Sequence, residues 1–569
     1  MAEKSVVVHP HWVRLWACFI ALGWLLPLHF KPWTTFHHDA WFAAASVLVA
    51  APLVLRITGP WPVPRLAMVL ALLACVPWLQ WWCGQIGLLG SVWMSFAYLL
   101  GFCLVVACGA RWEALAPGQL LEGLFLSLGI AAIASVWLQL RQWLVLDTGW
   151  EWWSMGGDAL RPYANISQSN QAATFLCLGL GALAWGGVRR QIGWLVGLLA
   201  AAFLLFGVAL SGSRTAYLGL ALVVLAVWHW RHRWPDARTP WRVTALFVLL
   251  LAYVAGLDVL AAAQSGRDAL SGTSAHVRLQ IWALSLQALE YAPWAGYGWN
   301  QTALAQLRTL DVHPGGLAPF TSAHNLFLDL LVWCGIPLGL LISVATLAWA
   351  YRRLKAVHRP DQAVLVLVLL VVFNHSMLEF PLHYAFFLLP VGWMLGVLEV
   401  RIGGDVGRWF RVPRAVVAAL YLSATALLAL IVVDYFPIEM AYRSLKLERA
   451  HIQIAQWETP GAVVITHLSD TLDMVRSVPQ GPLSLAELLH REQLTATSPD
   501  GFSIFYLAAA EALSGRPDQA VLWSQRFCKL SPPLDCVPAG AAWAKAAQGH
   551  PEMAAIPWPR SASVPDASP

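Results

Sequence analysis

Three residues that could take part in chemistry lie in short polar strings between long apolar stretches. Arg214 lies in Ser-Gly-Ser-Arg-Thr, Arg278 in His-Val-Arg-Leu-Gln, and His324 in Thr-Ser-Ala-His-Asn. A guanidinium group keeps its charge and can bind a phosphate through two parallel hydrogen bonds. Histidine is the side chain best suited to proton transfer near neutral pH. Together these residue types predict diphosphate binding combined with activation of a hydroxyl group.

Each of the three residues, taken alone, also fits a structural role. Arg214 and Arg278 could anchor segments at a membrane interface or form salt bridges with Asp268 or Glu290. His324 could simply be a polar residue at the start of a helix, with Asp329 deeper in the same segment.

Two further polar strings interrupt apolar segments and supply candidate substrate-binding residues. Gln168 and Asn170 lie in Asn-Ile-Ser-Gln-Ser-Asn-Gln, and His375 and Glu379 in Asn-His-Ser-Met-Leu-Glu-Phe-Pro. Ionisable residues at membrane depth are functional candidates by default, because burying them in hydrocarbon is costly.

The sequence contains no motif that predicts a metal, nucleotide or redox cofactor. It has no Asp-x-Asp, His-Glu-x-x-His, Walker-type Gly-Lys-Ser/Thr or Gly-x-Ser-x-Gly string. His37, His38 and Asp39 are adjacent and could bind a metal, but we favour an exposed interfacial loop there. We therefore expect an enzyme without a metal or other cofactor.

Composition places these residues in a membrane protein. Of 569 residues, 59% are hydrophobic and 12% are charged, whereas a soluble protein carries roughly 25% charged residues. The net charge of +5 reflects topology and does not predict nucleic-acid binding. Since a membrane-spanning helix needs about 20 apolar residues, we predict an all-α polytopic protein with thirteen spans. The expected spans are 12–28, 40–55, 66–80, 86–108, 118–140, 171–187, 192–210, 214–230, 242–262, 325–350, 362–378, 383–399 and 412–433.

The distribution of Lys and Arg among the connecting segments predicts the orientation. Cytoplasmic segments are enriched in basic residues, and one alternating set of connections contains most of them. That set holds Arg56, Arg65, Arg111, Arg189, Arg190, Arg231, Arg233, Arg238, Arg242, Arg352, Arg353, Lys355, Arg359, Arg401, Arg408, Arg411 and Arg414. The opposite set holds only Lys31, Arg141, Arg161, Arg214, Arg267, Arg278 and Arg308. We therefore expect a multi-pass inner-membrane protein with its polar C-terminal tail in the periplasm.

The order of apolar and polar segments predicts three regions. Residues 1–140 form N-terminal spans, 141–434 a catalytic membrane region with a long periplasmic loop at 263–324, and 435–569 a periplasmic helical domain. Periodic apolar residues predict helices near Leu483–Leu494 and Phe502–Leu513, weakly similar to a tetratricopeptide unit. In an oxidising periplasm, Cys528 and Cys536 are expected to form a disulfide.

Taken together, these strings resemble a known family. Ser213-Arg-Thr-Ala216, Arg278 followed by Gly296-Tyr-Gly298, and His324-Asn-Leu-Phe are similar to the O-antigen ligase/polymerase superfamily. The Gln-Ser-Asn string, the His-Ser-Met-Leu-Glu-Phe-Pro string and the helical tail resemble, within it, the PglL-like bacterial O-oligosaccharyltransferases of pilin glycosylation. One position departs from the superfamily, in which a Glu often precedes the glycine that here is Gly335; Trp333-Cys334 occupy that place.

The resemblance implies a metal-independent glycosyltransferase of the GT-C type. It would move a glycan en bloc from undecaprenyl diphosphate to a Ser or Thr hydroxyl of a periplasmic protein such as type IV pilin. Arg214 and Arg278 would hold the diphosphate and His324 would activate or orient the acceptor hydroxyl, with Gln168, Asn170, His375 and Glu379 contributing to substrate binding. Ligation to lipid A-core, polymerisation of repeat units and, least favoured, transport without chemistry remain as alternatives.

Overall fold

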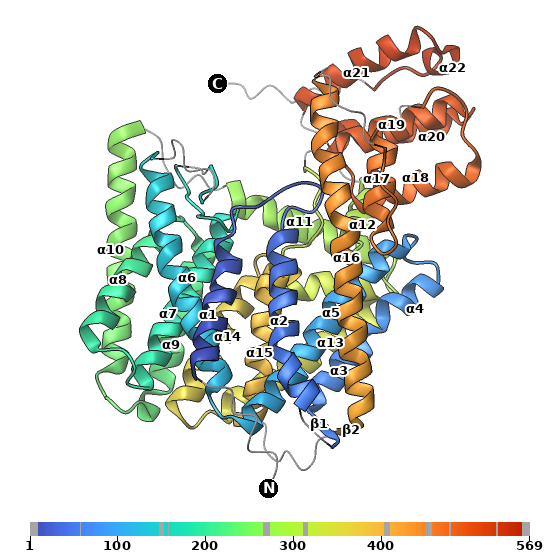
Figure 1. Cartoon of the computed structure of the whole chain (residues 1–569). Helices are drawn as coiled ribbons and strands as arrows, with labels where there is room; N and C mark the ends of the chain where they lie inside the picture. Colours follow the sequence, from blue (N-terminus) through green and yellow to red (C-terminus); the bar gives the residue numbers. More distant parts are fainter. Residues whose placement is uncertain are drawn as a thin grey trace. The chain divides into compact units, whose positions relative to one another are not determined.

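A computed structural model shows a predominantly helical chain (Figure 1). It describes residues 10–56, 59–146, 153–156, 159–265, 273–310, 317–402, 410–450, 452, 458–476, 479–530 and 533–559. The chain divides into two compact units. The first comprises Met1–Leu73, Ala97–Ser271 and Thr346–Ala429, and the second comprises Ala74–Phe96, Gly272–Ala345 and Leu430–Pro569.

The helices of the first unit follow the apolar segments of the sequence. They are α1 (Pro10–Leu25), α2 (Phe36–Arg56), α3 (Arg65–Ala74), α6 (Gln119–Trp143), α7 (Ser169–Val188), α8 (Trp194–Leu210), α9 (Arg214–His229), α10 (Thr239–Ser265), α14 (Pro360–Ser376) and α15 (Ala385–Arg401). Three longer helices have residues in both units: α5 (Leu89–Leu115), α13 (Leu326–Lys355) and α16 (Arg414–Arg449). Short 3-10 turns lie at η2 (Arg231–Arg233) and η3 (Pro381–His383).

Helices α6, α7 and α14 form the centre of the first unit. Helix α7 packs against α6, α8 and α14, and most residues of α14 are buried. Small residues allow this close approach: a Cβ on Gly179 would lie 2.5 Å from the Cβ of Ala132, so only glycine fits there. Membrane helices commonly pack through small residues, because the hydrophobic effect does not drive helices together within lipid.

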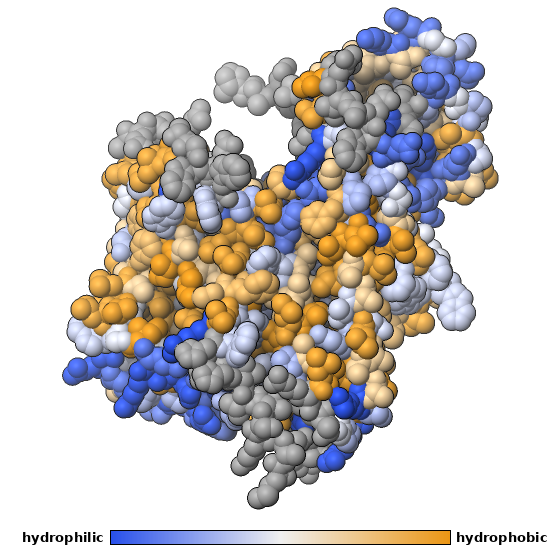
Figure 2. All heavy atoms as spheres, in the orientation of Figure 1, coloured by the Kyte–Doolittle hydropathy of each residue, from blue (hydrophilic) through white to orange (hydrophobic). Residues whose placement is uncertain are grey.

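Eight helices among the described residues are long and apolar enough to cross a membrane, and several shorter apolar helices accompany them. Each of the thirteen predicted spans overlaps a helix, the third being divided between α3 and α4 (Val76–Trp82). Very little of α10 is buried although the helix is strongly apolar, as expected for a surface that faces lipid. In Figure 2 hydrophilic residues gather at the end of the first unit that carries the α9–α10 connection, where Arg231, Arg238 and Asp236 lie. The chain is therefore a multi-pass membrane protein, and its thirteen-span count stays a prediction.

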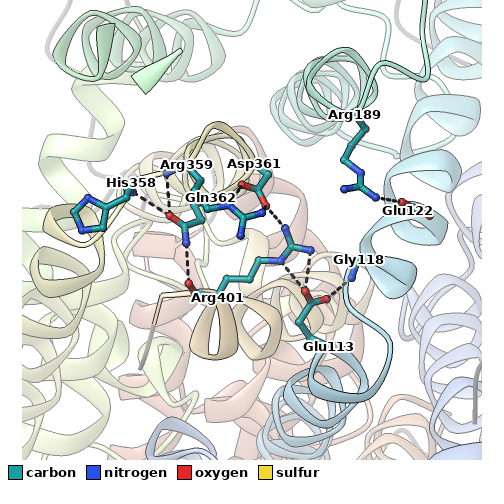
Figure 3. Close-up of polar contacts among 9 residues, drawn as sticks. All are labelled: Glu113, Gly118, Glu122, Arg189, His358, Arg359, Asp361, Gln362 and Arg401. Atoms are coloured by element: carbon teal, nitrogen blue, oxygen red, sulfur yellow. Dashed lines mark hydrogen bonds and ion pairs between the residues drawn. The ribbon is translucent and has the colours of Figure 1, made fainter. Parts of the chain in front are cut away.

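A buried ionic network joins α5, α14 and α15 (Figure 3). The Arg401 guanidinium forms ion pairs with Glu113, at 2.8 Å, and with Asp361, and it lies over the ring of Trp185. Arg359 forms two hydrogen bonds to Asp361, at 2.9 and 3.0 Å. All the partners come from connections that the sequence assigns to the cytoplasmic side. A two-stranded antiparallel sheet of β1 (Trp61–Val63) and β2 (Phe410–Val412) pairs Pro62 with Arg411.

The second unit contains the helices of the long loop and of the tail. Residues 263–324, expected to be a loop, form α11 (Thr273–Tyr291) and α12 (Thr302–Thr309). The tail forms α17 (Thr466–Arg476), α18 (Leu485–Thr497), α19 (Gly501–Leu513), α20 (Pro517–Leu530), α21 (Pro533–Ala547) and α22 (Pro551–Ala554).

An apolar cluster attaches the tail to the long loop within this unit. Leu307 and Leu310, at the end of α12, pack with Leu507, Trp523 and other buried residues of the tail. The Lys529 ammonium donates a hydrogen bond to the carbonyl of Leu310, at 2.8 Å. The predicted helices near 483–494 and 502–513 are present as α18 and α19, whereas the tetratricopeptide likeness stays a prediction.

Two further features concern the predictions for the tail, namely its disulfide and the residue at which it begins. Cys528 and Cys536 form a disulfide with Cα atoms 5.0 Å apart, within the range that disulfide geometry requires. Helix α16 continues without interruption through residues 434 and 435, where the sequence placed the start of the tail domain. The three regions read from the sequence stay predictions.

Candidate functional site

Arg214 is the first residue of α9 in the first unit. The chain turns at Gly212, which has a φ of +60°. Ser213 then caps α9, its hydroxyl oxygen accepting a hydrogen bond from the backbone N–H of Ala216, at 3.3 Å. The Arg214 side chain is exposed. Because the N-terminus of a helix favours anions, Arg214 adds a full positive charge to a position already suited to phosphate.

A chain of hydrogen bonds links the turn before Arg214 to Glu379. The Arg161 guanidinium donates to the carbonyl of Ser211, at 3.2 Å, and to the side-chain oxygen of Asn170, at 3.3 Å. The Asn170 amide in turn donates to the Glu379 carboxylate, at 3.0 Å. The structure thus brings two predicted substrate-binding residues, Asn170 and Glu379, into direct contact. Arg161, which was not predicted as a substrate-binding residue, joins them through Asn170.

His375 and Gln168 lie in the same unit but in different surroundings. His375 is completely buried in the last turn of α14, and its carbonyl accepts the N–H of Glu379, at 2.8 Å. Its neighbour Asn374 donates to the carbonyl of Thr215, at 2.9 Å, which joins α14 to the first turn of α9. Gln168 is half-buried and immediately precedes α7. Contact of either Gln168 or His375 with substrate stays a prediction.

In the second unit, the helix that carries Arg278 packs against the segment that carries His324. Ile281, one turn beyond Arg278 on α11, forms an apolar cluster with Phe320 and Ala323. Ala323 directly precedes His324. Both Arg278 and His324 are partly exposed, so each remains accessible to a ligand.

The His324 backbone has a left-handed conformation, with a φ of +53°. The buried Asp329 carboxylate holds the residues before it. One oxygen of Asp329 accepts the N–H of Ala323, at 2.7 Å, and the other accepts the hydroxyl of Ser322, at 2.6 Å. Left-handed residues other than glycine are uncommon and cluster at functional sites.

Helix α13 is interrupted at Gly335, whose backbone is not helical (φ +74°), and the Gly296-Tyr-Gly298 string packs against this interruption. Tyr297 and Gly298 donate backbone hydrogen bonds to the carbonyls of Val332 and Trp333, at 2.8 and 3.1 Å. The Tyr297 hydroxyl donates to the carbonyl of Ala288, at 2.8 Å, and burial raises the pKa of this phenol. The Gly296-Tyr-Gly298 string therefore has a structural role, because it holds the end of α11 against α13, the helix that follows His324.

The interpretation of residues 37–39 as an exposed loop was wrong. His38 and Asp39 lie in the first turn of α2 and are buried, because Asp39 accepts hydrogen bonds from Thr35, Tyr98 and the backbone N–H of Ala385. Across the described part of the chain, no group of three or more His, Cys, Asp or Glu residues is placed to hold a metal ion.

The predicted site residues fall into two groups. Arg214, Gln168, Asn170, His375 and Glu379 belong to the first unit, and Arg278 and His324 to the second. Convergence of the two arginines and the histidine on one cavity stays a prediction.

Comparisons with known proteins identify the family of the chain. Residues 199–343 match the family described as O-Antigen ligase, and residues 363–532 match the C-terminal region of a virulence factor membrane-bound polymerase. The chain is 31% identical over 505 residues to a general O-oligosaccharyltransferase of Acinetobacter baylyi, covering 86% of this chain and 87% of the relative. It is 29% identical over 245 residues to a ComP-specific O-oligosaccharyltransferase of the same organism, covering 42% and 44% of the two chains. This level of identity over nearly the whole length shows that the chain belongs to the O-oligosaccharyltransferase family of membrane glycosyltransferases.

Proposed function

We propose that this protein transfers a glycan en bloc from undecaprenyl diphosphate to a Ser or Thr hydroxyl of a periplasmic protein such as type IV pilin. The observation that carries the proposal is the packing of α11, with Arg278, against the segment of His324. An arginine for the diphosphate and a histidine for the hydroxyl are what such a transfer requires. Arg214, at the N-terminus of α9, is a second group suited to phosphate.

In the proposed reaction, the acceptor oxygen attacks the anomeric carbon of the glycan. A new C–O bond forms while the bond from that carbon to the diphosphate oxygen breaks, and the configuration inverts. His324 takes the hydroxyl proton, because a hydroxyl is a weak nucleophile at its own pKa. Undecaprenyl diphosphate leaves with the bonding electron pair, and Arg214 and Arg278 stabilise its developing charge. The arginines supply the positive charge, so the reaction as proposed uses no metal ion.

The proposed location is the bacterial inner membrane, with α17–α22 in the periplasm beside the acceptor. The predominance of basic residues on the opposite set of connections supports this orientation. The disulfide between Cys528 and Cys536 also fits an oxidising compartment. We infer that the protein is a glycosyltransferase of the GT-C type because the chain belongs to the O-oligosaccharyltransferase family.

Ligation to lipid A-core is the second candidate, because residues 199–343 match the O-antigen ligase family. Two considerations favour a protein acceptor. Both curated relatives are named as O-oligosaccharyltransferases, and the chain carries a helical tail that offers a surface for a protein.

The test is co-expression with a lipid-linked glycan pathway and a candidate pilin in a host without its own ligase or protein oligosaccharyltransferase. Intact-mass measurement should show pilin carrying the mass of one whole glycan. The modification should disappear with His324→Ala and with Ala at the acceptor Ser or Thr. Glycan on lipopolysaccharide and unmodified pilin would contradict the proposal and favour the ligase.

A further inference from the structure

Asp329 lies at the centre of a hydrogen-bond network in the second unit. The residue is 2% exposed, and its carboxylate accepts from three donors: the Ser322 hydroxyl, the Ala323 N–H and the Thr302 hydroxyl, the last at 3.2 Å. Trp333 continues the network, because its indole N–H donates to the Thr302 hydroxyl oxygen at 2.8 Å. A buried carboxylate with this many donors is satisfied and fixes the groups around it.

Two of the three donors control the backbone that leads into His324. Ser322 has a double role: its hydroxyl donates to Asp329, and its oxygen accepts the backbone N–H of His324, at 3.0 Å. The N–H of Ala323 donates to the other oxygen of the same carboxylate. Asp329 therefore holds the peptide groups on both sides of Ala323.

The residue after His324 is fixed as well. The Asn325 side chain caps α13, its oxygen accepting the N–H groups of Phe327 and Leu328, at 3.1 and 3.2 Å. His324 thus lies between a segment held by Asp329 and a helix start held by Asn325. Its left-handed conformation, which few residues other than glycine adopt, is the connection between these two fixed points.

We propose that Asp329 is a positioning residue for the glycosyl transfer: through Ser322 and Ala323 it sets the backbone, and so the imidazole, of His324. This inference rests on the proposed role of His324. Asp329 itself does not touch substrate. Loss of this positioning should slow transfer, because a displacement of a catalytic group by about 1 Å can lower the rate by on the order of 100-fold.

Ser322 and Thr302 provide a matched pair of variants. Each is almost fully buried and donates one hydroxyl hydrogen bond to the same carboxylate. Only Ser322 also bonds to the backbone of His324. If Asp329 acts through His324, Ser322→Ala should lower kcat by about 10-fold or more, whereas Thr302→Val should lower it by less than about 3-fold.

The Asp329→Asn variant keeps the shape of the side chain but removes its charge and one acceptor. We expect kcat to fall by about 10-fold or more, while the KM for the lipid-linked donor stays within about 2-fold of wild type.

A second buried aspartate controls for loss of stability. Asp434 also accepts three hydrogen bonds, from the backbone N–H groups of Val463, Val464 and Ile465. All three donors belong to the tail, and none to the segment that carries His324. Asp434→Asn should lower the melting temperature at least as much as Asp329→Asn while leaving the kcat of the folded fraction near wild type.

All variants are measured as the full chain in detergent, with a purified polyprenyl diphosphate-linked glycan and a purified acceptor protein. Equal kcat values for Ser322→Ala and Thr302→Val would overturn the inference, as would a loss of kcat in Asp329→Asn that Asp434→Asn reproduces at the same melting temperature. If Asp329→Asn does not fold, the Ser322 and Thr302 pair decides. Failure of the wild-type protein to transfer glycan in this assay would instead contradict the proposed function.

Discussion

The backbones of Gly296 and Gly335 lie so close together that neither position has room for a side chain. A Cβ on Gly296 would lie 2.5 Å from the backbone nitrogen of Gly335, and a Cβ on Gly335 would lie 2.5 Å from the carbonyl of Trp294. Both residues have a positive φ, +72° and +74°. The contact fixes the end of α11 and the turn after it against the interruption of α13, the helix that follows His324.

Gly296→Ala should therefore destabilise the protein and impair transfer. Alanine would have to adopt a left-handed conformation, at about 1–2 kcal/mol, and would also displace backbone atoms that cannot rotate away. Gly84→Ala is the matched control, since Gly84 has a φ of +76° and nothing within 4 Å of a Cβ. Thermal unfolding in detergent should show a clearly larger loss for Gly296→Ala. Equal losses would mean that the backbone contact has no energetic importance.

Arg401→Ala should destabilise the first unit much more than Arg189→Ala. Removing Arg401 leaves the buried carboxylate of Glu113 without its ion-pair partner and Asp361 with Arg359 alone, and breaking a buried pair costs about 3–5 kcal/mol. The Arg189–Glu122 pair is partly exposed, at 45% and 34% of the side chains, and such pairs contribute at most about 1 kcal/mol.

The measurement is the midpoint of thermal inactivation at one fixed scan rate, because membrane proteins commonly unfold irreversibly. Figure 3 shows that the two ion pairs lie close together, and all four residues belong to the first unit. The comparison therefore tests the burial of each pair rather than the region of the protein in which it lies. Similar shifts for the two variants would show that the buried network is not a major source of stability.

The sequence predicted the helices of the membrane region because each contains a long apolar run. It did not predict α11, whose polar and apolar residues alternate without a strong apolar face, or the short α12. A hydropathy criterion of about 20 residues detects spans and overlooks such helices.

The candidate site was predictable in its residue types but not in its contacts. Arg214, Arg278 and His324 stood out because charged or protonatable groups are rare beside apolar segments. The partners of Asp329 come from Thr302, Ser322 and Ala323, and the link from Arg161 to Asn170 depends on how separate segments fold together. The periodicity of apolar residues along the sequence does not predict such contacts between distant segments, so only the tertiary structure shows them.

Stability should fall as the pH decreases below 6.5, partly through His467 in the tail. Burial lowers the pKa of His467 to about 4, although Asp470 opposes this. Between pH 6.5 and 4 the unfolded state therefore binds more protons than the folded state, and stability is lost as the pH falls. At pH 5 the contribution reaches about 2 kcal/mol.

The test compares melting temperatures of wild type and His467→Gln at pH 7 and pH 5. The variant should lose less stability on acidification. His490 is the control of opposite sign, because its hydrogen bond to Asp470 raises its pKa, so its contribution is present at low pH and lost as the pH rises. His490→Gln should thus lose more stability on acidification than wild type. An unchanged pH dependence in His467→Gln would exclude this histidine as a source.

Arg278→Lys should impair transfer although it keeps the positive charge. Lysine lacks the planar fork that binds two phosphate oxygens at once, so kcat/KM for the donor should fall by about 10-fold or more. His324→Ala should abolish transfer while donor binding remains, because a base acts mainly in the transition state.

A chelator provides the control for the role of charge. If arginines supply the positive charge at the diphosphate, ethylenediaminetetraacetate should leave transfer unchanged. Loss of activity with the chelator, restored by a divalent ion, would contradict the metal-free reaction and direct attention to Asp329 and Glu379. Near wild-type transfer by His324→Ala would show that this histidine is only a polar residue at the start of a helix and has no catalytic role.

Reporter fusions should place the α9–α10 and α13–α14 connections in the cytoplasm and the tail in the periplasm. Fusions after Trp234 and after Arg359 follow segments rich in arginine, which the membrane potential and insertion machinery retain inside. Fusions near Asp311, outside the described residues, and at the C-terminus should show periplasmic reporter activity. Thiol labelling gives an independent readout, since Cys528 and Cys536 should react with maleimide only after reduction if their disulfide forms in the cell. Cysteine pairs rarely stay oxidised in the cytoplasm. A cytoplasmic C-terminus with two reactive thiols would remove both the periplasmic position of α17–α22 and their proposed role beside the acceptor protein.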